Sequence, residues 1–366
     1  MPSKFSLTIL SLSSLIALQS VPPVFARDDV GQKLAKAAEL LNRGKAGAAA
    51  SILHGVIVGH PSDSQAHMEL GAALACLADN DDYDSAIAEE KKALELDPNS
   101  YYARKILGHI YTNLHKSEES IAILKEACAI NPRSYAAHRD LGIALMTAGK
   151  NDEAMKSFED AIKIDPTRPD AHGKLSLLYL QKDKFKEAVN EGKKAVKLDV
   201  PNPEAHLALA NALLASGDKL GAIEPYETAL QANFEKPYRN PLTAAASISG
   251  IGWAFLVKGA GPKELAEAAN DQRQAIKIFP AFGPAYVRLA EILLLQGNTK
   301  KADAVYQVSI KLSQDDAGVS TAYAKYLVKT GRTEEAKSVL KKVLEKRPDY
   351  KPAAEKLAEL DNERAS

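Results

Sequence analysis

The chain has 366 residues, of which 46% are hydrophobic and only 6% aromatic, and its 47 basic residues balance its 47 acidic ones. A chain of this length holds either two or three ordinary domains or one elongated array. No basic block supplies the positive field that attracts nucleic acid, so the composition argues against nucleic-acid binding.

The first element in chain order is a predicted signal peptide, residues 1–26. Lys4 gives it a short basic start, residues 5–18 are mainly apolar, and residues 24–26 offer the small or modest side chains that a signal peptidase reads. A membrane anchor is the alternative, but the apolar stretch is shorter than the roughly 20 residues that a membrane-spanning helix needs. We therefore expect cleavage after Ala26, export to the periplasm or the exterior, and no membrane span in the mature chain.

A fixed pattern of small residues recurs along the rest of the chain. It consists of a small residue, a turn residue seven positions later, two further small residues and a proline: Gly142, Gly149, Ala154, Ala161 and Pro166. Shifted mostly by 34 residues, the pattern fits nine repeats. We call the first small residue of each repeat its reference residue: Ala37, Gly71, Gly108, Gly142, Ser176, Ala210, Gly252, Ala290 and Ala324.

Each repeat predicts two helices joined by a short turn. In the fourth repeat, apolar residues recur at helical spacing in both halves: Ala137, Leu141, Ala144 and Leu145, then Ala154, Phe158, Ala161 and Ile162. Gly149 suits a turn with positive φ, and Asn151 or Asp152 is expected to cap the second helix. The small residues are expected where two helices cross closely, since a large side chain would push the axes apart.

This period and these small-residue positions resemble the tetratricopeptide repeat (TPR) family. The resemblance covers about residues 30–350, although the aromatic residue usual near the start of the first helix is replaced in several repeats by histidine: His67, His138, His172 and His206. It implies an all-α fold, a right-handed α-solenoid of about nine helix-turn-helix units, each packed on its neighbours. Residues 348–366 are expected to form a capping helix.

The spacing widens between the sixth and seventh repeats. From Ala210 to Gly252 there are 42 residues, and Pro237 and Pro241 favour an extended connection. A tolerated surface insertion is one explanation, and a hinge or ledge is the other. The expected division is a six-repeat array over 27–235, a proline-containing linker over 236–245, and three repeats with a capping helix over 246–366.

The sequence predicts no cofactor, no metal site and no enzyme. The four repeated histidines would lie roughly 10 Å or more apart in successive repeats, whereas zinc ligands converge to about 2 Å from one ion. The acidic stretch 78–84 lacks the alternation of a calcium loop, and neither a phosphate-binding loop nor a nucleophile elbow occurs. Cys76 and Cys128 are expected to be small buried residues, and a disulfide bond between them is left open.

In the TPR family the first helices line a concave groove that receives a peptide or helix. The resemblance places groove residues at −6, −3, +1, +4 and +5 from the reference residue. The candidates chosen from these positions are Tyr102, Lys105, His109 and Asn113 in the third repeat, Arg139, Ile143 and Met146 in the fourth, Asn211 in the sixth and Trp253 in the seventh. This mixture of cationic, amide and apolar groups suits a polar or acidic peptide.

The family also contains co-chaperone domains that grip a C-terminal carboxylate, and their residue set is incomplete here. Lys105 fits one place, but His109 replaces an asparagine and Asp140 stands where a neutral amide is expected. The main hypothesis is therefore an exported, non-enzymatic scaffold that binds protein or peptide segments in its groove, in envelope assembly. The alternative is a TPR subunit that presents substrate to a separate cell-wall or glycan-modifying enzyme; fold alone does not decide between them.

Overall fold

The computed structural model describes residues 29–78, 83–199, 201–234, 240–256, 260–312, 316–348 and 350–362. Over these ranges the chain is all-α, with nineteen helices and no strand. The predicted signal peptide, Gly259 and most of the acidic stretch 78–84 lie outside the described residues. The helices are α1 (Asp29–Asn42), α2 (Ala46–Gly59), α3 (Ser64–Leu77), α4 (Asp84–Leu96), α5 (Tyr101–Asn113), α6 (Ser117–Ile130), α7 (Tyr135–Thr147), α8 (Asn151–Ile164), α9 (Pro169–Gln181), α10 (Phe185–Leu198), α11 (Pro203–Ala215), α12 (Ile223–Phe234), α13 (Pro241–Ala254), α14 (Pro262–Ile278), α15 (Gly283–Leu295), α16 (Thr299–Leu312), α17 (Ala317–Lys329), α18 (Thr333–Lys346) and α19 (Lys351–Asn362).

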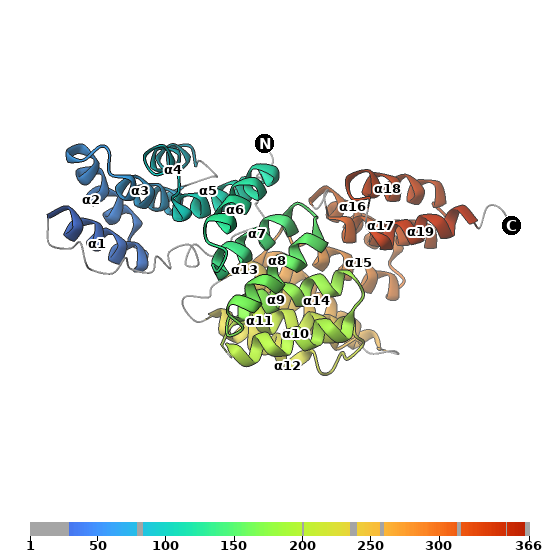
Figure 1. The fold of residues 1–366 in the computed structure, drawn as a ribbon. Coiled ribbons are helices and arrows are strands. Elements are labelled where there is room, and N and C mark those ends of the chain that lie inside the picture. Colours follow the sequence, from blue (N-terminus) through green and yellow to red (C-terminus); the bar gives the residue numbers. More distant parts are fainter. Residues whose placement is uncertain are drawn as a thin grey trace. The chain divides into compact units, whose positions relative to one another are not determined.

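The chain forms two compact parts, residues 1–166 with α1 to α8 and residues 167–366 with α9 to α19 (Figure 1). Within each part, the first helix of a repeat packs on its own second helix, and both pack on the first helix of the next repeat. This nearest-neighbour packing is that of a helical solenoid, and α19 packs on α17 and α18. The division expected at residues 236–245 stays a prediction, and the flanking helices α12 and α13 pack on each other.

The turn between the two helices has a left-handed backbone in most repeats. Five glycines at this position have positive φ: Gly44 (70°), Gly149 (76°), Gly217 (93°), Gly297 (77°) and Gly331 (77°). In the third and fifth repeats the same position holds His115 (φ 55°) and Asp183 (φ 56°). A Cβ atom is crowded in this conformation, so the predicted turn position follows from a backbone requirement.

Replacing His115 with glycine is therefore expected to stabilise the chain by about 0.5–1 kcal/mol, because relief of the left-handed strain exceeds the extra entropy of an unfolded glycine. Urea unfolding followed by far-ultraviolet circular dichroism measures the change. The matched control is Gly149→Ala, which should destabilise by about 1 kcal/mol. A loss of stability on His115→Gly would contradict the strain argument.

One position of the second helix is buried in all nine repeats and forms the centre of each. It usually lies sixteen residues after the reference residue, and we call it the core position: Leu53, Glu90, Leu124, Phe158, Gly192, Tyr226, Gln272, Tyr306 and Leu340. An ideal Cβ built on Gly108 would lie 2.5 Å from Cγ of Leu124, and one on Gly142 would lie 2.8 Å from Cε1 of Phe158. The two reference glycines are small because a large core residue fills the space beside them.

The seventh repeat departs from the predicted register. Its first helix ends at Ala254, and the residue five positions earlier, where seven other repeats have the reference residue, is Ser249. The Ser249 hydroxyl donates to Oε1 of Gln272 (2.6 Å), and Nε2 of Gln272 donates to the Ser249 carbonyl (3.1 Å). The assignment of Gly252 as reference residue was wrong by three positions, because a buried serine–glutamine pair replaces the usual contact of a small with an apolar residue.

Side-chain N-caps lie on first helices, not on the second helix for which one was predicted. The capping residues are Asp63, Ser100, Ser134, Asn202, Asn240 and Asp316. In the fourth repeat Lys150 occupies the N-cap position of α8 without a side-chain cap, and Asn151 is already the first helical residue. The predicted cap at Asn151 or Asp152 was therefore wrong. Asp152 lies in the first turn, where its charge favours the helix dipole.

Two of the four repeated histidines, His67 and His172, lie at seams between helices, as predicted. His67 is hydrogen-bonded through Nδ1 to Glu89 of α4 (2.6 Å) and through Nε2 to the Pro61 carbonyl (3.0 Å), and His172 is bonded to Glu191 of α10 (2.6 Å). These bonds tie a first helix to its second helix and to the preceding turn. Among the described residues, no group of three or more histidine, cysteine, aspartate and glutamate side chains could hold a metal ion.

The two cysteines, Cys76 and Cys128, are half-buried free thiols. Burial raises the pKa of Cys76 to about 11 and that of Cys128 to about 12. Both sulfurs are therefore protonated, unreactive thiols at neutral pH. The disulfide bond that the sequence left open is not formed.

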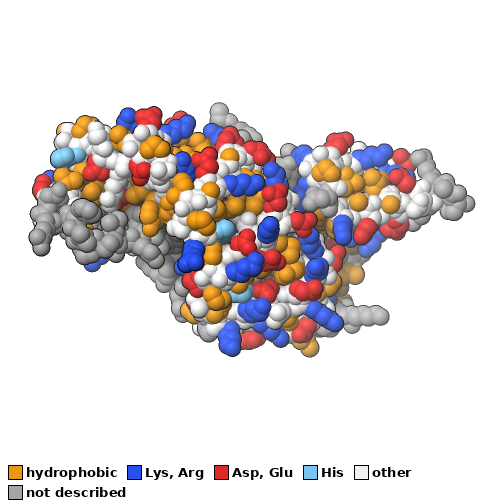
Figure 2. Space-filling model, viewed as in Figure 1, with side chains coloured by type: hydrophobic (Ala, Val, Ile, Leu, Met, Phe, Trp, Pro, Cys, Tyr) orange, Lys and Arg blue, Asp and Glu red, His pale blue; other side chains and the backbone are white. Residues whose placement is uncertain are grey.

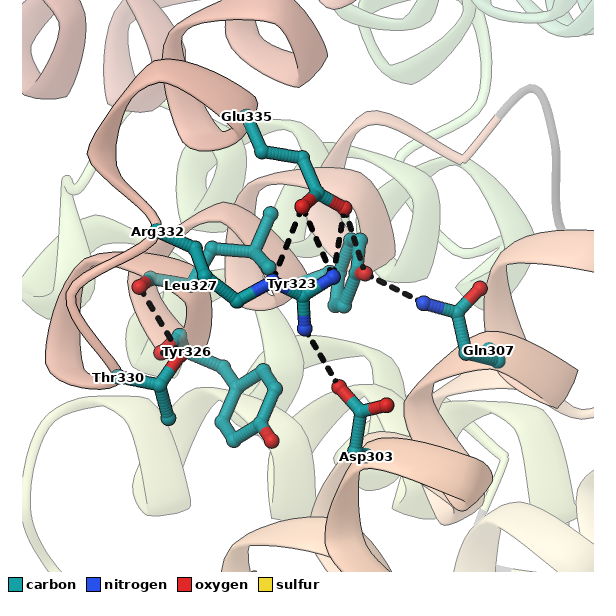
Figure 3. Close-up of polar contacts among 8 residues, drawn as sticks. All are labelled: Asp303, Gln307, Tyr323, Tyr326, Leu327, Thr330, Arg332 and Glu335. Carbon is teal, nitrogen blue, oxygen red and sulfur yellow. Dashed lines mark hydrogen bonds and ion pairs between the residues drawn. The ribbon is translucent and has the colours of Figure 1, made fainter. Parts of the chain in front are cut away.

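A polar network joins α16, α17 and α18 in the last two repeats (Figure 3). Arg332 donates to Asp303 (2.8 Å) and through two nitrogens to Glu335 (2.9 and 2.8 Å). The Tyr323 hydroxyl accepts from Gln307 (2.5 Å) and donates to Glu335 (3.3 Å). Exposed pairs of this kind contribute at most about 1 kcal/mol each, so the network mainly orients α18 on α16.

Candidate binding site

The predicted groove residues lie on the first helices of four repeats. They are Tyr102, Lys105, His109 and Asn113 on α5, Arg139, Ile143 and Met146 on α7, Asn211 on α11, and Trp253 on α13. The seven on α5 and α7 share the N-terminal part of the chain, and α5 packs on α7. Asn211 and Trp253 belong to the C-terminal part, so only the first seven form one candidate site here.

Polar side chains form a stripe along α5. Lys105, His109 and Asn113 are each four residues apart, which places them on one face with a rise of about 6 Å per step. They are 4%, 6% and 8% exposed, respectively. Tyr102 extends the stripe by one turn, and its ring centroid lies 5.6 Å from Nζ of Lys105, a cation–π distance.

Helix α7 contributes a buried ion pair beside this stripe. Nε and Nη2 of Arg139 donate to Oδ1 of Asp140 at 2.9 and 2.7 Å. The charges of both residues act on Lys105 and on His109. Asp140 was absent from the predicted groove residues. Its position, where the carboxylate-gripping domains have a neutral amide, could have identified it as a residue of this site. We name these five residues the α5–α7 cluster: Lys105, His109, Asn113, Arg139 and Asp140.

Burial determines the protonation of the cluster. It lowers the pKa of Lys105, and the nearby Asp140 carboxylate opposes that change. Burial also lowers the pKa of His109 to about 4, and the cations Arg139 and Lys105 lower it further while Asp140 raises it. His109 is therefore neutral at physiological pH. The cations Lys105 and Arg139 and the carboxylate of Asp140 together give the cluster one net positive charge.

Two buried atoms of the cluster have no hydrogen-bond partner among the described residues, namely Nε2 of His109 and Oδ1 of Asn113. A buried polar atom without a partner costs about 1–3 kcal/mol, and both atoms are closed to solvent. Lys105 makes no ion pair with a described residue, although it is only 4% exposed. The cluster contains no hydroxyl or thiol nucleophile, and its groups suit recognition of a polar or acidic segment.

The other candidates differ in accessibility. Ile143 is 4% exposed and belongs to the core, whereas Met146 is half-buried. Oδ1 of Asn211 accepts a hydrogen bond from the Tyr226 hydroxyl (2.6 Å). Trp253 is half-buried, and Nζ of Lys219 lies 6.0 Å from the centroid of its ring.

Figure 2 shows basic and acidic side chains interspersed over the described surface in that view, with no large area of one sign.

Helices that pack only on their neighbours in sequence define a helical repeat protein. Three tetratricopeptide repeat models match the chain: one at residues 115–178 and 145–191, one at 34–101 and 174–237, and one at 283–316 and 318–350. The chain belongs to the tetratricopeptide repeat family, which confirms the resemblance seen in the sequence. Arrays of this family are protein-interaction scaffolds. Within the described residues, no helix is both long and apolar enough to cross a membrane.

Solved structures that match with a TM-score of 0.50 or more share the fold. The APC/C hetero-tetramer Cut9–Hcn1 matches with a TM-score of 0.62 and 15% identity, over 86% of this chain and 58% of that chain. PilF of Pseudomonas aeruginosa matches with a TM-score of 0.50 and 21% identity, over 64% of this chain and 99% of that chain. MamA of Desulfovibrio magneticus RS-1 matches with a TM-score of 0.42 and 23% identity, over 47% and 96% of the two chains. The comparison with curated proteins gave no match.

Proposed function

We propose that this chain is an exported, non-enzymatic TPR scaffold that binds protein or peptide segments along the first helices of its repeats, in assembly of the cell envelope. The export component rests on the predicted signal peptide at residues 1–26. The binding component rests on the α5–α7 cluster, where two cations lie beside buried polar atoms that lack partners. No other single observation supports binding as directly.

The chemistry of the cluster favours a polar or acidic partner segment. Lys105 offers a cation that no described carboxylate neutralises at ion-pair distance, and neutral His109 and Asn113 add hydrogen-bonding capacity. The Arg139 guanidinium is already bonded to Asp140, so it contributes mainly long-range attraction. The matching Cut9–Hcn1 structure is that of a hetero-tetramer, which agrees with an array of this fold acting within an assembly.

The test is a comparison of partners captured by the mature chain, residues 27–366, in its native compartment by proximity labelling. Lys105→Glu combined with Arg139→Glu should remove the main partners, because the change reverses the charge that an acidic segment meets. The control reverses two exposed cations of second helices, Lys125→Glu and Lys163→Glu, and should leave the partners unchanged. These control side chains are 57% and 73% exposed.

Circular dichroism must first show that each variant is folded, because Arg139 is buried. If the double reversal unfolds the chain, Lys105→Gln with Asn113→Ala replaces it, since these changes leave the Arg139–Asp140 pair intact. An unchanged partner list with folded variants would contradict the placement of the binding site. If the partner that the wild-type chain captures and the variant loses is a cell-wall or glycan-modifying enzyme, the result would instead support the alternative function, a subunit that presents substrate to that enzyme.

A further inference from the structure

The core position of the second repeat holds a carboxylic acid. At this position other repeats bury leucine, phenylalanine or tyrosine, as at Leu124 and Phe158 in the two repeats that follow. The second repeat instead has Glu90, whose exposed fraction is 0%. An ideal Cβ on its reference glycine, Gly71, would lie 2.5 Å from Oε1 of Glu90. The carboxyl group therefore lies directly in the crossing of α3 and α4.

Neither carboxyl oxygen of Glu90 has a hydrogen-bond partner among the described residues. The other titratable or charged groups of α4 and of the helices that pack on it are His67, Glu69 and Cys76 on α3, Tyr101, Tyr102, Arg104, Lys105, His109 and Tyr111 on α5, and Asp84, Glu89, Lys91, Lys92 and Glu95 on α4. Two of these groups are engaged elsewhere, since His67 bonds to Glu89 and Arg104 to Glu126. Among the described residues, the only charged group that acts appreciably on Glu90 is the acidic Glu89.

The seventh repeat shows how a polar side chain at the core position is stabilised when it has hydrogen-bond partners. Gln272 at the same position is also fully buried, but its amide exchanges two hydrogen bonds with Ser249. Glu90 faces Gly71, which has no side chain to offer. The neutral carboxyl fits this space, whereas a buried charge without a partner carries a large desolvation cost.

Burial raises the pKa of Glu90 well above its ordinary value, and the neighbouring Glu89 raises it further. Burial also raises the pKa of Glu69, on α3, to about 7. For an acid whose pKa is higher in the folded state, the unfolded state binds fewer protons between the two pKa values, so stability falls as pH rises through that window. The full contribution is present below about pH 4.5 and is lost as pH passes the folded-state value.

We propose that Glu90 makes the second repeat a proton-dependent switch: the neutral carboxyl keeps α3 packed on α4, and its ionisation loosens that pair. Within the N-terminal part, α1 and α2 pack on the rest only through α3 among the principal helix contacts. Loosening α3 therefore also releases the first repeat, as expected where each repeat is held by its neighbours. This inference does not depend on the proposed function.

Hydrogen exchange of the full chain at about pH 5 and about pH 7.5 tests the switch. After correction for intrinsic rates, amides of α1 to α4 should lose at least about tenfold in protection at the higher pH, which corresponds to one pKa unit. Amides of α7 and α8, where Phe158 holds the core position, should change little. Glu90→Leu, which installs the residue of the first and third repeats, should remove the part of the loss in α1 to α4 that Glu90 causes and leave only the part due to Glu69.

Glu90→Gln is the second variant, because it keeps the shape of the side chain without an ionisable group, and it should reduce the loss as Glu90→Leu does. Glu89→Gln is the matched control; it retains Glu90 and should retain most of the loss. Glu69→Gln should remove only the part of the loss that Glu69 itself causes. The proposal is overturned if wild-type protection in α1 to α4 is the same at both pH values. It is equally overturned if the loss is undiminished in folded Glu90→Leu and Glu90→Gln.

Discussion

Phe158→Ala should lower the local unfolding free energy of the fourth repeat by about 3–5 kcal/mol, the usual cost of removing a buried aromatic side chain. Phe158 is 0% exposed and fills the space beside Gly142. The surrounding helices cannot close the cavity without moving α7 towards α8. In a chain whose repeats support each other only locally, a loss of this size should unfold α7 and α8 before the rest.

Urea unfolding with two probes measures this effect. Far-ultraviolet circular dichroism reports all helices, whereas Trp253, the single tryptophan, reports only the C-terminal part. For Phe158→Ala, an early loss of ellipticity should precede the change in Trp253 fluorescence. Phe158→Leu should cost much less, about 1 kcal/mol, and Phe234→Ala, at a side chain that is 63% exposed, should cost less than about 0.5 kcal/mol. Equal effects of all three substitutions would show that the core position is not the centre of the repeat.

The fold could be predicted from the sequence because the strongest constraints on this fold are steric and recur at a regular spacing along the chain. A left-handed turn favours glycine at Gly149, and a close helix crossing favours it at Gly142, so both positions recur at a readable spacing. The register failed in the seventh repeat because Ser249 with Gln272 solves the same crossing by hydrogen bonds. Serine is small enough for the pattern, as Ser176 is in the fifth repeat, but Gly252 was preferred because a glycine follows it by seven residues. Only the hydrogen bonds to Gln272 distinguish Ser249 from Gly252.

The sequence predicted which helix face three of the candidate residues share, but not their burial or protonation, and their role in binding stays a prediction. Position along α5 follows from helical spacing, so Lys105, His109 and Asn113 share a face as expected. Their burial, and the neutrality of His109 that results from it, depend on packing between repeats, which no single segment encodes. The Arg139–Asp140 bond was missed for a related reason: adjacent residues on a helix point in different directions, and only the three-dimensional structure shows that these two side chains meet.

Gly142→Leu is expected to destabilise the chain by about 1–3 kcal/mol through overpacking. An ideal Cβ at this position already lies 2.8 Å from the Phe158 ring, so a leucine side chain must displace the ring or separate α7 from α8. The better helix propensity of leucine over glycine, about 1 kcal/mol, opposes this cost and is part of the net value. The same urea titration measures it.

The combination of Gly142→Leu with Phe158→Ala separates overpacking from other causes. If the two side chains compete for one space, leucine should partly fill the cavity that alanine leaves, and the double variant should be more stable than additivity predicts by about 0.5–3 kcal/mol. Gly55→Leu in α2 is the control, because nothing lies within 4 Å of an ideal Cβ there, and it should be neutral or stabilising. Strict additivity of the two changes would mean that Gly142 is small for a reason other than the Phe158 ring.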